Sequence, residues 1–450
     1  MCGIFAIYGE AKFEELFWGL YSLQHRGQEG VGLCYKNGKE LKFLKSSGFV
    51  LDFFSKNDFL KNLKSKCFLG HVRYSTFGGV KWENLQPIGF RYKGRWLAIA
   101  HNGNIPFASF LRKNLEKEGR TFHSTSDSEV LLHLYAEDIG DIPDKIHKLS
   151  QIAQGAFSFV IVDGENMIAF RDVYGFRPLY IGFKDGNIYF SSEDCAFNMI
   201  GVSQRKELEP GEGVWIDENG EANYFKIEDK VKKFQCVFEL IYFARPDSHI
   251  FGKSVYKFRV KSGELLAEDE KEDADIVVPI PDSGNYAAFG FSRKLKIPLE
   301  FGLLRNHYVG RSFIQPKMSL RKFTVKMKLL PIPETIKGKK IFLIDDSIVR
   351  GTTSKLIVDM LKEFGAKEIH FRVASPPITS PCFFGIDMPT KEELIASNKN
   401  VEDVKKFLGV DTLRYLSLDK LKKLAGEDFC YACFDGKYPD FLKREINNEI

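Results

Sequence analysis

Apolar positions in the first half of the chain alternate with polar ones over short segments bounded by Gly, Asn or Asp. The clearest segments are "ENMIAFRD" (165–172), "GNIYFSSE" (186–193) and "GEGVWIDENGEANYFKI" (211–227). A period of two between turn residues is typical of antiparallel strands joined by turns. Helices are predicted at "AKFEELFWGLYSLQH" (11–25) and "SDSEVLLHLYAEDI" (126–139), and this half is otherwise expected to be rich in strands.

The pattern changes near residue 230, after a charged stretch. Beyond it, continuous apolar runs occupy 274–280, 339–345 and 366–375, and the first two lead into helix-like segments. Strands of this kind that feed amphipathic helices indicate a parallel sheet buried on both faces. Because single cores stop growing at roughly 250 to 300 residues, we divide the 450 residues into domains at 1–230 and 231–450.

Composition narrows the class of protein. Hydrophobic residues make up 44% of the chain, with 41 Phe and 17 Tyr, which supplies core material for two folded domains. No run of eighteen apolar residues and no signal-peptide pattern occurs, so we expect a cytoplasmic protein with no membrane partner. The net charge of +5 comes from interleaved Lys and Glu rather than a basic cluster, which disfavours a nucleic-acid partner.

The clearest chemistry in the second half is the string "IFLIDDSIVRGTTS". A buried strand ends in two acids, and the loop after it opens a helix whose backbone amides and hydroxyl groups can hold a terminal phosphate. The acids can bind sugar hydroxyls or Mg²⁺, although acids at a strand end can also simply cap the next helix. The order of these features favours a ribose phosphate, and the string lacks the GxxxxGK[ST] of NTPases. The residues concerned are Asp345, Asp346, Ser347, Arg350, Gly351, Thr352 and Thr353.

Motifs along the whole chain resemble those of the glutamine phosphoribosylpyrophosphate (PRPP) amidotransferase family. The first half contains "LQHRGQEGVG", "GHVRYST", "AHNGNI", "SDSEV" and "RDVYGFRPL", and the second contains "CVFELIYFARPDS", "VVPIPDSG", "DDSIVRGTT" and "FCYACFDGKYP". The resemblance implies an N-terminal Ntn-hydrolase domain with a four-layer αββα sandwich. It also implies a C-terminal type I phosphoribosyltransferase domain, a parallel sheet flanked by helices.

The reaction that the resemblance implies converts glutamine, PRPP and water to 5-phosphoribosylamine, pyrophosphate and glutamate, the entry step of purine synthesis. Removal of Met1, which the small Cys2 permits, leaves Cys2 with a thiol nucleophile and an α-amine able to take the thiol proton. The attack creates an oxyanion that needs preorganised donors. By resemblance, the Asn102 side chain and the Gly103 amide provide them.

Four further residues are assigned to glutamine binding. Arg73 offers a planar fork for the carboxylate of glutamine, and Asp127 offers a charge for its ammonium group. These two roles are implied by the resemblance, because each residue taken alone is as suited to a surface ion pair. Arg26 and Gly27 border the same pocket by the same analogy.

The PRPP site gains residues by resemblance. Ser283 in "IPDSG" matches a Mg²⁺ ligand of the family beside Asp345 and Asp346. The long basic stretch "RNHYVGRSFIQPKMSLRKFTVKMKL" is expected to be a lid over PRPP that excludes water. The matching lid positions are Tyr308, Arg311 and Lys328, whereas Met318 and Leu330 depart from the common family pattern, which has Gln and Asn there.

Cysteines provide a further expectation. Eight cysteines in a cytosolic chain argue for catalysis or a metal rather than disulfides. Cys430 and Cys433 form a CxxC, with Cys236 and Cys382 upstream, and four thiolates suit either Zn²⁺ or a [4Fe-4S] cluster. The resemblance implies the cluster, in a structural role. Three other cysteines lie in apolar segments and are predicted to be core residues: Cys34, Cys67 and Cys195.

Two other functions fit parts of the sequence. A non-catalytic, PRPP-binding regulator would share the phosphoribosyltransferase fold but would leave Cys2, Arg73, Asn102 and Asp127 without a role. Another amidotransferase with an N-terminal cysteine, such as a glucosamine-phosphate or asparagine synthetase, would share the first half but not the PRPP loop. The resemblance further implies purine nucleotides as feedback inhibitors and a homotetramer.

Overall fold

The N-terminal half of the chain forms two antiparallel sheets that pack face to face. The structure is a computed structural model of the whole chain and describes residues 2–10, 12–74, 81–137, 140–227, 232–306, 329–388 and 390–442. The first sheet has seven strands in the order β11-β9-β10-β1-β4-β2-β3, and the second has six in the order β13-β12-β8-β7-β6-β5. The strands are β1 (Gly3–Tyr8), β2 (Gly30–Asn37), β3 (Glu40–Ser47), β4 (Cys67–Arg73), β5 (Ile88–Tyr92), β6 (Arg95–Asn104), β7 (Ala156–Asp163), β8 (Asn166–Arg171), β9 (Tyr180–Lys184), β10 (Asn187–Ser191), β11 (Gln204–Glu207), β12 (Glu212–Ile216) and β13 (Ala222–Lys226).

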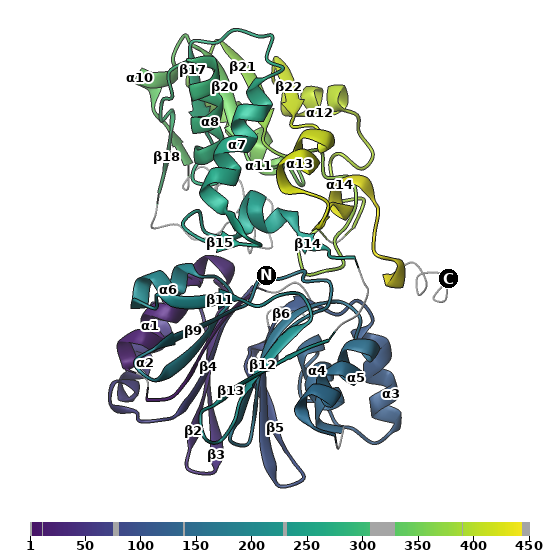
Figure 1. Cartoon of the computed structure of the whole chain (residues 1–450). Helices are drawn as coiled ribbons and strands as arrows, with labels where there is room; N and C mark the ends of the chain where they lie inside the picture. The colour runs from purple at the N-terminus through teal and green to yellow at the C-terminus, as the bar shows by residue number, and fades with distance from the viewer. Residues whose placement is uncertain are drawn as a thin grey trace.

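Helices cover the outer face of each sheet, which gives four layers in the order helix, sheet, sheet, helix (Figure 1). The helices on the first sheet are α1 (Phe13–Ser22), α2 (Val50–Lys56) and α6 (Cys195–Ile200). The helices on the second sheet are α3 (Ala108–Lys117), α4 (Asp127–Glu137) and α5 (Ile142–Ile152). The predicted αββα sandwich is therefore confirmed.

Strand β1 illustrates how the sequence produces these layers. Ile4 and Ala6 point between the two sheets, whereas Phe5 and Ile7 pack under the helices of the first sheet. All four are fully buried, because β1 lies between β10 and β4 and both of its faces are covered. An apolar strand of this kind, placed centrally, holds the residue that precedes it, Cys2, in the interior of the domain.

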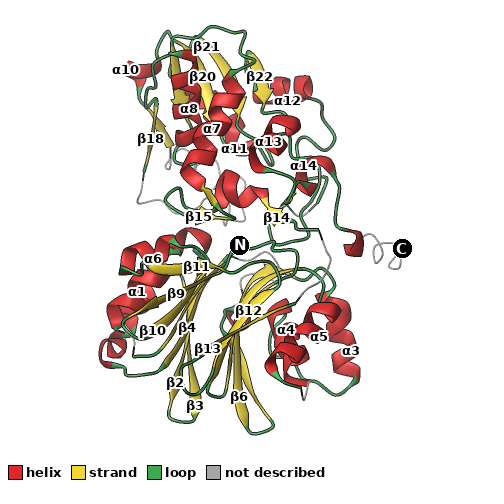
Figure 2. Cartoon of the chain, viewed as in Figure 1, coloured by secondary structure: helices red, strands yellow, loops and turns green. Residues whose placement is uncertain are grey.

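The C-terminal half is built on a four-stranded parallel sheet in the order β17-β20-β21-β22 (Figure 2). Phe342 and Ile344 of β20 face one helical layer, and Ile341 and Leu343 face the other. This confirms the prediction of a parallel sheet buried on both faces. The strands are β17 (Ile276–Pro279), β20 (Lys340–Asp345), β21 (Glu368–Val373) and β22 (Thr412–Tyr415). The main helices are α7 (Val255–Ala267), α8 (Asn285–Leu295), α11 (Thr352–Glu363), α12 (Val401–Leu408) and α13 (Leu418–Ala425).

Short elements lie around this sheet and at the junction with the other domain. Strand β14 (Gln235–Cys236) comes first along the chain, and a π-helical turn, η4 (Glu239–Phe243), follows it. The paired strands are β14 (Gln235–Cys236) with β23 (Phe429–Cys430), β15 (His249–Ile250) with β16 (Lys253–Ser254), and β18 (Leu303–Arg305) with β19 (Leu329–Pro331). The remaining helices are η1 (Gln24–Arg26), η2 (Asp58–Asn62), η3 (Trp82–Asn84), α10 (Pro333–Ile336) and α14 (Ala432–Asp435).

The predicted elements agree with the observed ones to within a few residues. The segments at 165–172 and 186–193 contain β8 and β10, and 211–227 contains the hairpin of β12 and β13. The helix predicted at 11–25 is shorter, since α1 ends at Ser22 and a separate 3₁₀ turn follows. Within the described residues, every helix is too short or too polar to cross a membrane.

Candidate functional site

Cys2 lies at the start of β1 and is only 7% exposed. Its backbone nitrogen donates to Asn102 Oδ1 at 3.2 Å, and its Sγ lies 3.7 Å from the carbonyl oxygen of Tyr74. The nitrogen becomes the α-amine once Met1 is removed. Both reactive groups of a candidate nucleophile are therefore held by fixed hydrogen bonds.

Asn102 and Gly103 lie near the end of β6, directly beside Cys2. Asn102 is fully buried, and while its Oδ1 accepts from Cys2, its Nδ2 has no hydrogen-bond partner among the described residues. Buried side-chain amides rarely leave a donor unused. At Gly103 any side chain is excluded, because a Cβ would lie 1.9 Å from the carbonyl oxygen of Ala156. The side chain that binds the Cys2 nitrogen therefore keeps a free N–H donor, as an oxyanion hole requires.

The predicted glutamine-binding residues border this region. Arg73 is the last residue of β4 and Asp127 the first of α4, and both are buried. Asp127 Oδ2 accepts from Ile105 N at 3.1 Å and lies 3.7 Å from His101 Nδ1. Gly27 packs on the backbone of Arg73, where a Cβ would lie 2.6 Å from its nitrogen. The structure thus brings Gly27 and Arg73 together.

Arg26 lies behind the nucleophile rather than in an open pocket. It is 0% exposed, and its Nε donates to the Cys2 carbonyl oxygen at 2.8 Å. Its other two nitrogens donate to Glu193 and Glu239. Burial alone would lower the pKa of Arg26, but the two carboxylates raise it. Every nitrogen of this guanidinium therefore has an acceptor within the protein, and its Nε contacts the backbone of the candidate nucleophile. That Arg26 borders the glutamine pocket stays a prediction.

Two buried histidines flank the site. His71 Nε2 lies 3.2 Å from the His101 carbonyl oxygen, and His101 Nδ1 lies 3.1 Å from Ser128 Oγ. Burial, reinforced by the charge of Arg73, lowers the pKa of His71 to about 3. Burial also lowers the pKa of His101. An imidazole with a pKa as low as that of His71 is a poor base near neutrality.

The acid pair stands at the carboxyl end of the central strand β20. Asp345 Oδ1 accepts from the backbone nitrogen of Asp346 at 2.9 Å, and Asp346 Oδ2 accepts from Ser347 Oγ at 2.5 Å. Burial and the adjacent charge of Asp346 raise the pKa of Asp345. Burial also raises the pKa of Asp346, although hydrogen bonds from Ser283 and Ser347 oppose the shift. Ser283, predicted as the third magnesium ligand, therefore does lie beside the pair.

The loop after the acids has the form of a phosphate cradle. Gly351, with φ +73°, is the N-cap of α11, and Thr352 and Thr353 are exposed in the first turn of that helix. Arg350 pairs with Glu393 at 2.6 Å and with Asp387 at 3.7 Å. The hydroxyl groups and amides at the start of α11 are thus open to a phosphate, while Arg350 is held by two acids.

Three predicted lid residues, Tyr308, Arg311 and Lys328, lie outside the described residues, as does Met318. Leu330 is described: it is half exposed on β19 and stands opposite Leu304 of β18. Leu330, one of the two departures from the family pattern, therefore lies on the exposed side of a two-stranded ribbon.

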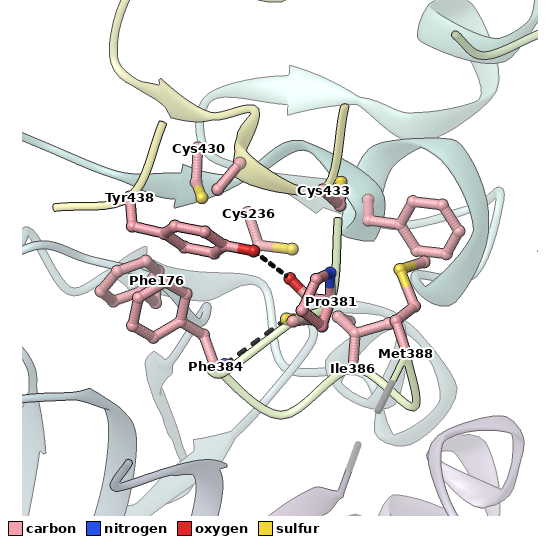
Figure 3. A pocket seen from close by; sticks show the side chains of 12 residues that line it. Phe176, Cys236, Pro381, Phe384, Ile386, Met388, Cys430, Cys433 and Tyr438 are labelled. Atoms are coloured by element: carbon pink, nitrogen blue, oxygen red, sulfur yellow. Dashed lines mark hydrogen bonds between the residues drawn. The ribbon is translucent and has the colours of Figure 1, made fainter. Parts of the chain in front are cut away.

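The four cysteines line one cavity at the domain junction (Figure 3). Pairing of β14 with β23 sets Cys236 opposite Cys430, and Cys433 follows in α14. Phe384 N donates to Cys382 Sγ at 3.4 Å. Burial raises the pKa of Cys236 to about 11, and it also raises the pKa of Cys430 and that of Cys433. Four residues distant in sequence thus meet, as the expected ligand set requires.

All eight cysteines are free thiols. Cys34, Cys67 and Cys195 are buried in apolar surroundings, so their predicted core placement is confirmed.

Sequence reasoning missed several charged residues that hold these sites together. Glu193 and Glu239 pair with Arg26, Arg177 pairs with Glu239, and Arg305 pairs with Asp282 of the "PDSG" loop. A signal existed for Glu239, since a lone acid inside the apolar run "VFELIYF" must find a buried partner. Its partners could not be read from the sequence.

Comparisons with known proteins agree with this geometry. A glutamine amidotransferase domain model matches residues 71–199, and a phosphoribosyl transferase domain model matches residues 259–375. The fold and the two sites therefore define a two-domain enzyme that joins a glutamine amidotransferase to a phosphoribosyltransferase. The amidophosphoribosyltransferase of Methanocaldococcus jannaschii is 45% identical over 100% of this chain and 99% of its own length. The chain belongs to the amidophosphoribosyltransferase family.

Other relatives extend this result. The amidophosphoribosyltransferase of Bacillus subtilis is 42% identical over 97% of this chain and 94% of its own length. A solved structure of the glutamine PRPP amidotransferase from B. subtilis, complexed with ADP and GMP, matches with a TM-score of 0.89 over 97% of both chains. A second solved structure, of an allosteric regulatory enzyme of purine biosynthesis, matches with a TM-score of 0.90 at 42% identity, over 97% of this chain and 96% of the other.

The chain is accordingly an enzyme of purine biosynthesis with glutamine amidotransferase and pentosyltransferase activities. The matches span both halves of the chain, so the alternative of a non-catalytic PRPP-binding regulator is not favoured. A synthetase that shares only the first half is not favoured either, because the second half matches a phosphoribosyl transferase domain.

Proposed function

We propose that Cys2 hydrolyses glutamine and that the ammonia is consumed at the loop carrying Asp345 and Asp346. The observation that carries this proposal is the unpartnered Nδ2 of Asn102, whose Oδ1 accepts from the backbone nitrogen of Cys2. The α-amine of Cys2 takes the thiol proton, and the thiolate attacks the amide carbon of glutamine. Asn102 Nδ2 and the Gly103 amide stabilise the oxyanion. Ammonia leaves, and water then hydrolyses the thioester to glutamate.

Glutamine is recognised at its other end by two charges. The Arg73 guanidinium pairs with its carboxylate, and Asp127 pairs with its ammonium group. Gly27 lines the pocket through its contact with the Arg73 backbone. These charges hold the substrate amide toward the thiol of Cys2, which is the positioning that hydrolysis requires.

PRPP binds at the carboxyl end of the parallel sheet. Its 5-phosphate lies against the amides and hydroxyl groups at the start of α11, a favourable place for an anion. Asp345, Asp346 and Ser283 would hold Mg²⁺, which neutralises the pyrophosphate leaving group; their mutual contacts support this assignment. Ammonia then displaces pyrophosphate from C1. The 5-phosphate contacts come from Ser347, Arg350, Gly351, Thr352 and Thr353, and the lid contacts from Tyr308, Arg311 and Lys328.

The four cysteines would hold a [4Fe-4S] cluster. Their shared cavity fits a thiolate ligand set, and iron would offset the high thiol pKa values that burial produces. Within the described ranges, no three His, Cys, Asp or Glu side chains are placed to hold a single metal ion. The assignment to a cluster therefore rests on the common cavity and the family resemblance. The cluster would be structural, because amide transfer is not a redox reaction.

Regulation, assembly and location follow the family. Purine nucleotides are proposed as feedback inhibitors, in line with the B. subtilis enzyme complexed with ADP and GMP. We further propose a homotetramer in the cytoplasm. The two matched domains fall on either side of residue 230, which supports the domain division at 1–230 and 231–450.

Pyrophosphate release in the presence of PRPP, with either glutamine or ammonium as nitrogen source, tests the two-site scheme. Cys2→Ala is expected to abolish glutamine-dependent release and to retain ammonia-dependent release, because only the first site needs the thiol. Cys34→Ala, at a buried thiol on β2 outside both sites, is the matched control. Equal loss of both activities in Cys2→Ala would refute the scheme.

A further inference from the structure

Glu239 lies at the junction of the two domains and is fully buried. It begins the π-helical turn η4, three residues after Cys236. Its Oε1 accepts from Arg26 Nη2 at 2.8 Å and from Arg177 Nη1 at 3.2 Å, and its Oε2 accepts from Arg26 Nη1 at 3.1 Å. Both arginines are 0% exposed and belong to the glutaminase half. One carboxylate therefore holds two buried guanidinium groups of the neighbouring domain.

The first arginine leads to the nucleophile. Arg26 Nε donates to the carbonyl oxygen of Cys2 at 2.8 Å. That carbonyl carbon is bonded to the Cα from which the thiol and the α-amine project. A shift of the Arg26 guanidinium would therefore move both reactive groups of Cys2.

The second arginine leads to the oxyanion hole. Arg177 Nη2 donates to the carbonyl oxygen of Phe384. The next residue, Gly385, packs so closely on the oxyanion glycine that a Cβ on it would lie 3.0 Å from the carbonyl oxygen of Gly103. The segment that Arg177 holds is thus the backing of Gly103.

Further contacts tie the same segment to β6. Asn104 Nδ2 donates to the carbonyl oxygen of Phe383 at 2.8 Å. Ser158 Oγ donates to the carbonyl oxygen of Arg177 at 3.0 Å, and Ser158 is the register partner of Asn102. The backbone of Arg177 therefore also contacts β7, the strand that pairs with β6 at Asn102.

We propose that Glu239 is a positioning residue for glutamine hydrolysis, acting through Arg26 on Cys2 and through Arg177 on the backing of Gly103. The inference rests on the glutaminase site proposed above. Replacing a buried ion network by apolar packing is often neutral or stabilising, so we assign this network a role in positioning rather than in stability. Here that geometry sets the nucleophile and the oxyanion hole relative to each other.

Glu239→Gln tests the proposal in the full-length enzyme, because it keeps the side-chain size and removes the charge. The kcat of glutamine-dependent synthesis is expected to fall about 10²-fold, the loss that a displacement of about 1 Å causes. The KM for glutamine stays the same, since Arg73 and Asp127 are not bonded to Glu239. Ammonia-dependent synthesis is retained. A purely structural role would lower both activities together, so an unchanged ratio of the two would overturn the proposal.

Glu270→Gln is the matched control. The Glu270 side chain is 2% exposed and also pairs with two arginines, Arg372 and Arg414, but it lies beside the sheet of the other domain. Its substitution removes a similar network and is expected to leave the ratio of the two activities unchanged. A selective loss of glutamine-dependent synthesis in Glu270→Gln would contradict the assignment of the effect to Glu239.

Two further variants distinguish a failure of the positioning role from misfolding and from a failure of the proposed glutaminase site. If Glu239→Gln does not fold, Arg177→Lys is the substitute, because it keeps the positive charge but lacks the planar fork that spans Glu239 and the Phe384 carbonyl oxygen. It must lower the ratio of glutamine-dependent to ammonia-dependent synthesis, and an unchanged ratio overturns the proposal. Cys2→Ala tests the proposed site itself. Loss of glutamine-dependent activity in Cys2→Ala without selective loss in Glu239→Gln would overturn only the positioning role.

Discussion

The side-chain amide of Asn102 uses only one of its two ends. Its Oδ1 accepts from Cys2 N, while its Nδ2 has no partner among the described residues and is the proposed oxyanion donor. Asn102→Ala is expected to lower the kcat of glutamine hydrolysis by about 10²- to 10³-fold, the usual effect of losing one oxyanion donor. Steady-state glutaminase kinetics measure the change, with the surface variant Asn198→Ala as control. Wild-type kcat in Asn102→Ala would remove this residue from the oxyanion hole.

Asp345 and Asp346 give a different prediction, because they are proposed to act in the attack of ammonia on PRPP. Glutamine-dependent and ammonia-dependent synthesis share this step. Asp346→Asn removes a carboxylate from the proposed magnesium site. Synthesis from glutamine and from ammonia is expected to fall by more than about 10²-fold, since loss of even an outer-shell partner costs about 10- to 100-fold. Pyrophosphate release at several magnesium concentrations measures the effect. Normal turnover in Asp346→Asn, set beside the surface variant Asp359→Asn, would exclude Asp346 from the PRPP site.

Candidate catalytic residues could be proposed from the sequence, whereas the residues that position them could not. Cys2, Asn102 and Asp346 stand out as candidates because their types and local motifs suit the proposed chemistry. Arg26 and Glu239 are 213 positions apart in sequence, so their pairing is a property of the folded chain alone. For this reason the sequence placed Arg26 only at the border of the glutamine pocket, and its contacts with Cys2 and two carboxylates became visible in the structure alone.

Helix α4 links the glutamine site to a pH-sensitive contact. Its first residue is Asp127, and two turns later His133 is packed between the rings of Phe90 and Phe122, with centroid distances of 4.4 and 4.5 Å. Burial lowers the pKa of His133 to about 4. The unfolded chain, with an ordinary histidine pKa of about 6.5, binds the proton first as pH falls. Stability contributed by neutral His133 is therefore complete above about pH 6.5 and is lost as pH falls toward 4.

Replacement of this histidine isolates its contribution. His133→Leu is expected to reduce the fall in melting temperature between pH 7 and pH 4.5 relative to the wild-type enzyme. Part of the fall remains, because burial also lowers the pKa of His71 to about 3. Thermal unfolding at a series of pH values gives the comparison. Identical pH profiles for the two proteins would show that His133 is not a source of the acid sensitivity.

The elements themselves were predictable where their signals are local. The segment 186–193 has alternating polarity and became β10, and the apolar run 339–345 became β20. Sheet order was not predictable, because it depends on contacts between distant segments: β1 pairs with β10, which lies more than 170 residues away. The end of α1 at Ser22 was also missed. The 3₁₀ turn that follows it carries Arg26 to buried partners that are distant in sequence, and local patterns do not reveal such contacts.

On the scale of the whole molecule, the two domains were predictable and their junction was not. The change in hydrophobic pattern near residue 230 separates two kinds of sheet. Nothing in that pattern indicates that the segment around Cys382 crosses back to the first domain, where Phe383 accepts from Asn104. The cysteine cavity at this junction includes Phe384, whose neighbour Gly385 packs on Gly103 of the first domain. A cluster in this cavity would therefore stabilise a segment that contacts both halves.

Iron content is therefore the decisive measurement for the molecule as a whole. Enzyme purified without oxygen is expected to be brown and to contain iron and sulfide, because four thiols share the cavity that also contains Phe384 and Met388. Cys430→Ser should lose iron and melt at a lower temperature, since ligand binding energy is also folding energy. Cys67→Ser, at a buried thiol on β4, should keep its iron. Stoichiometric zinc without iron would overturn the cluster, and full iron in Cys430→Ser would exclude this cysteine as a ligand.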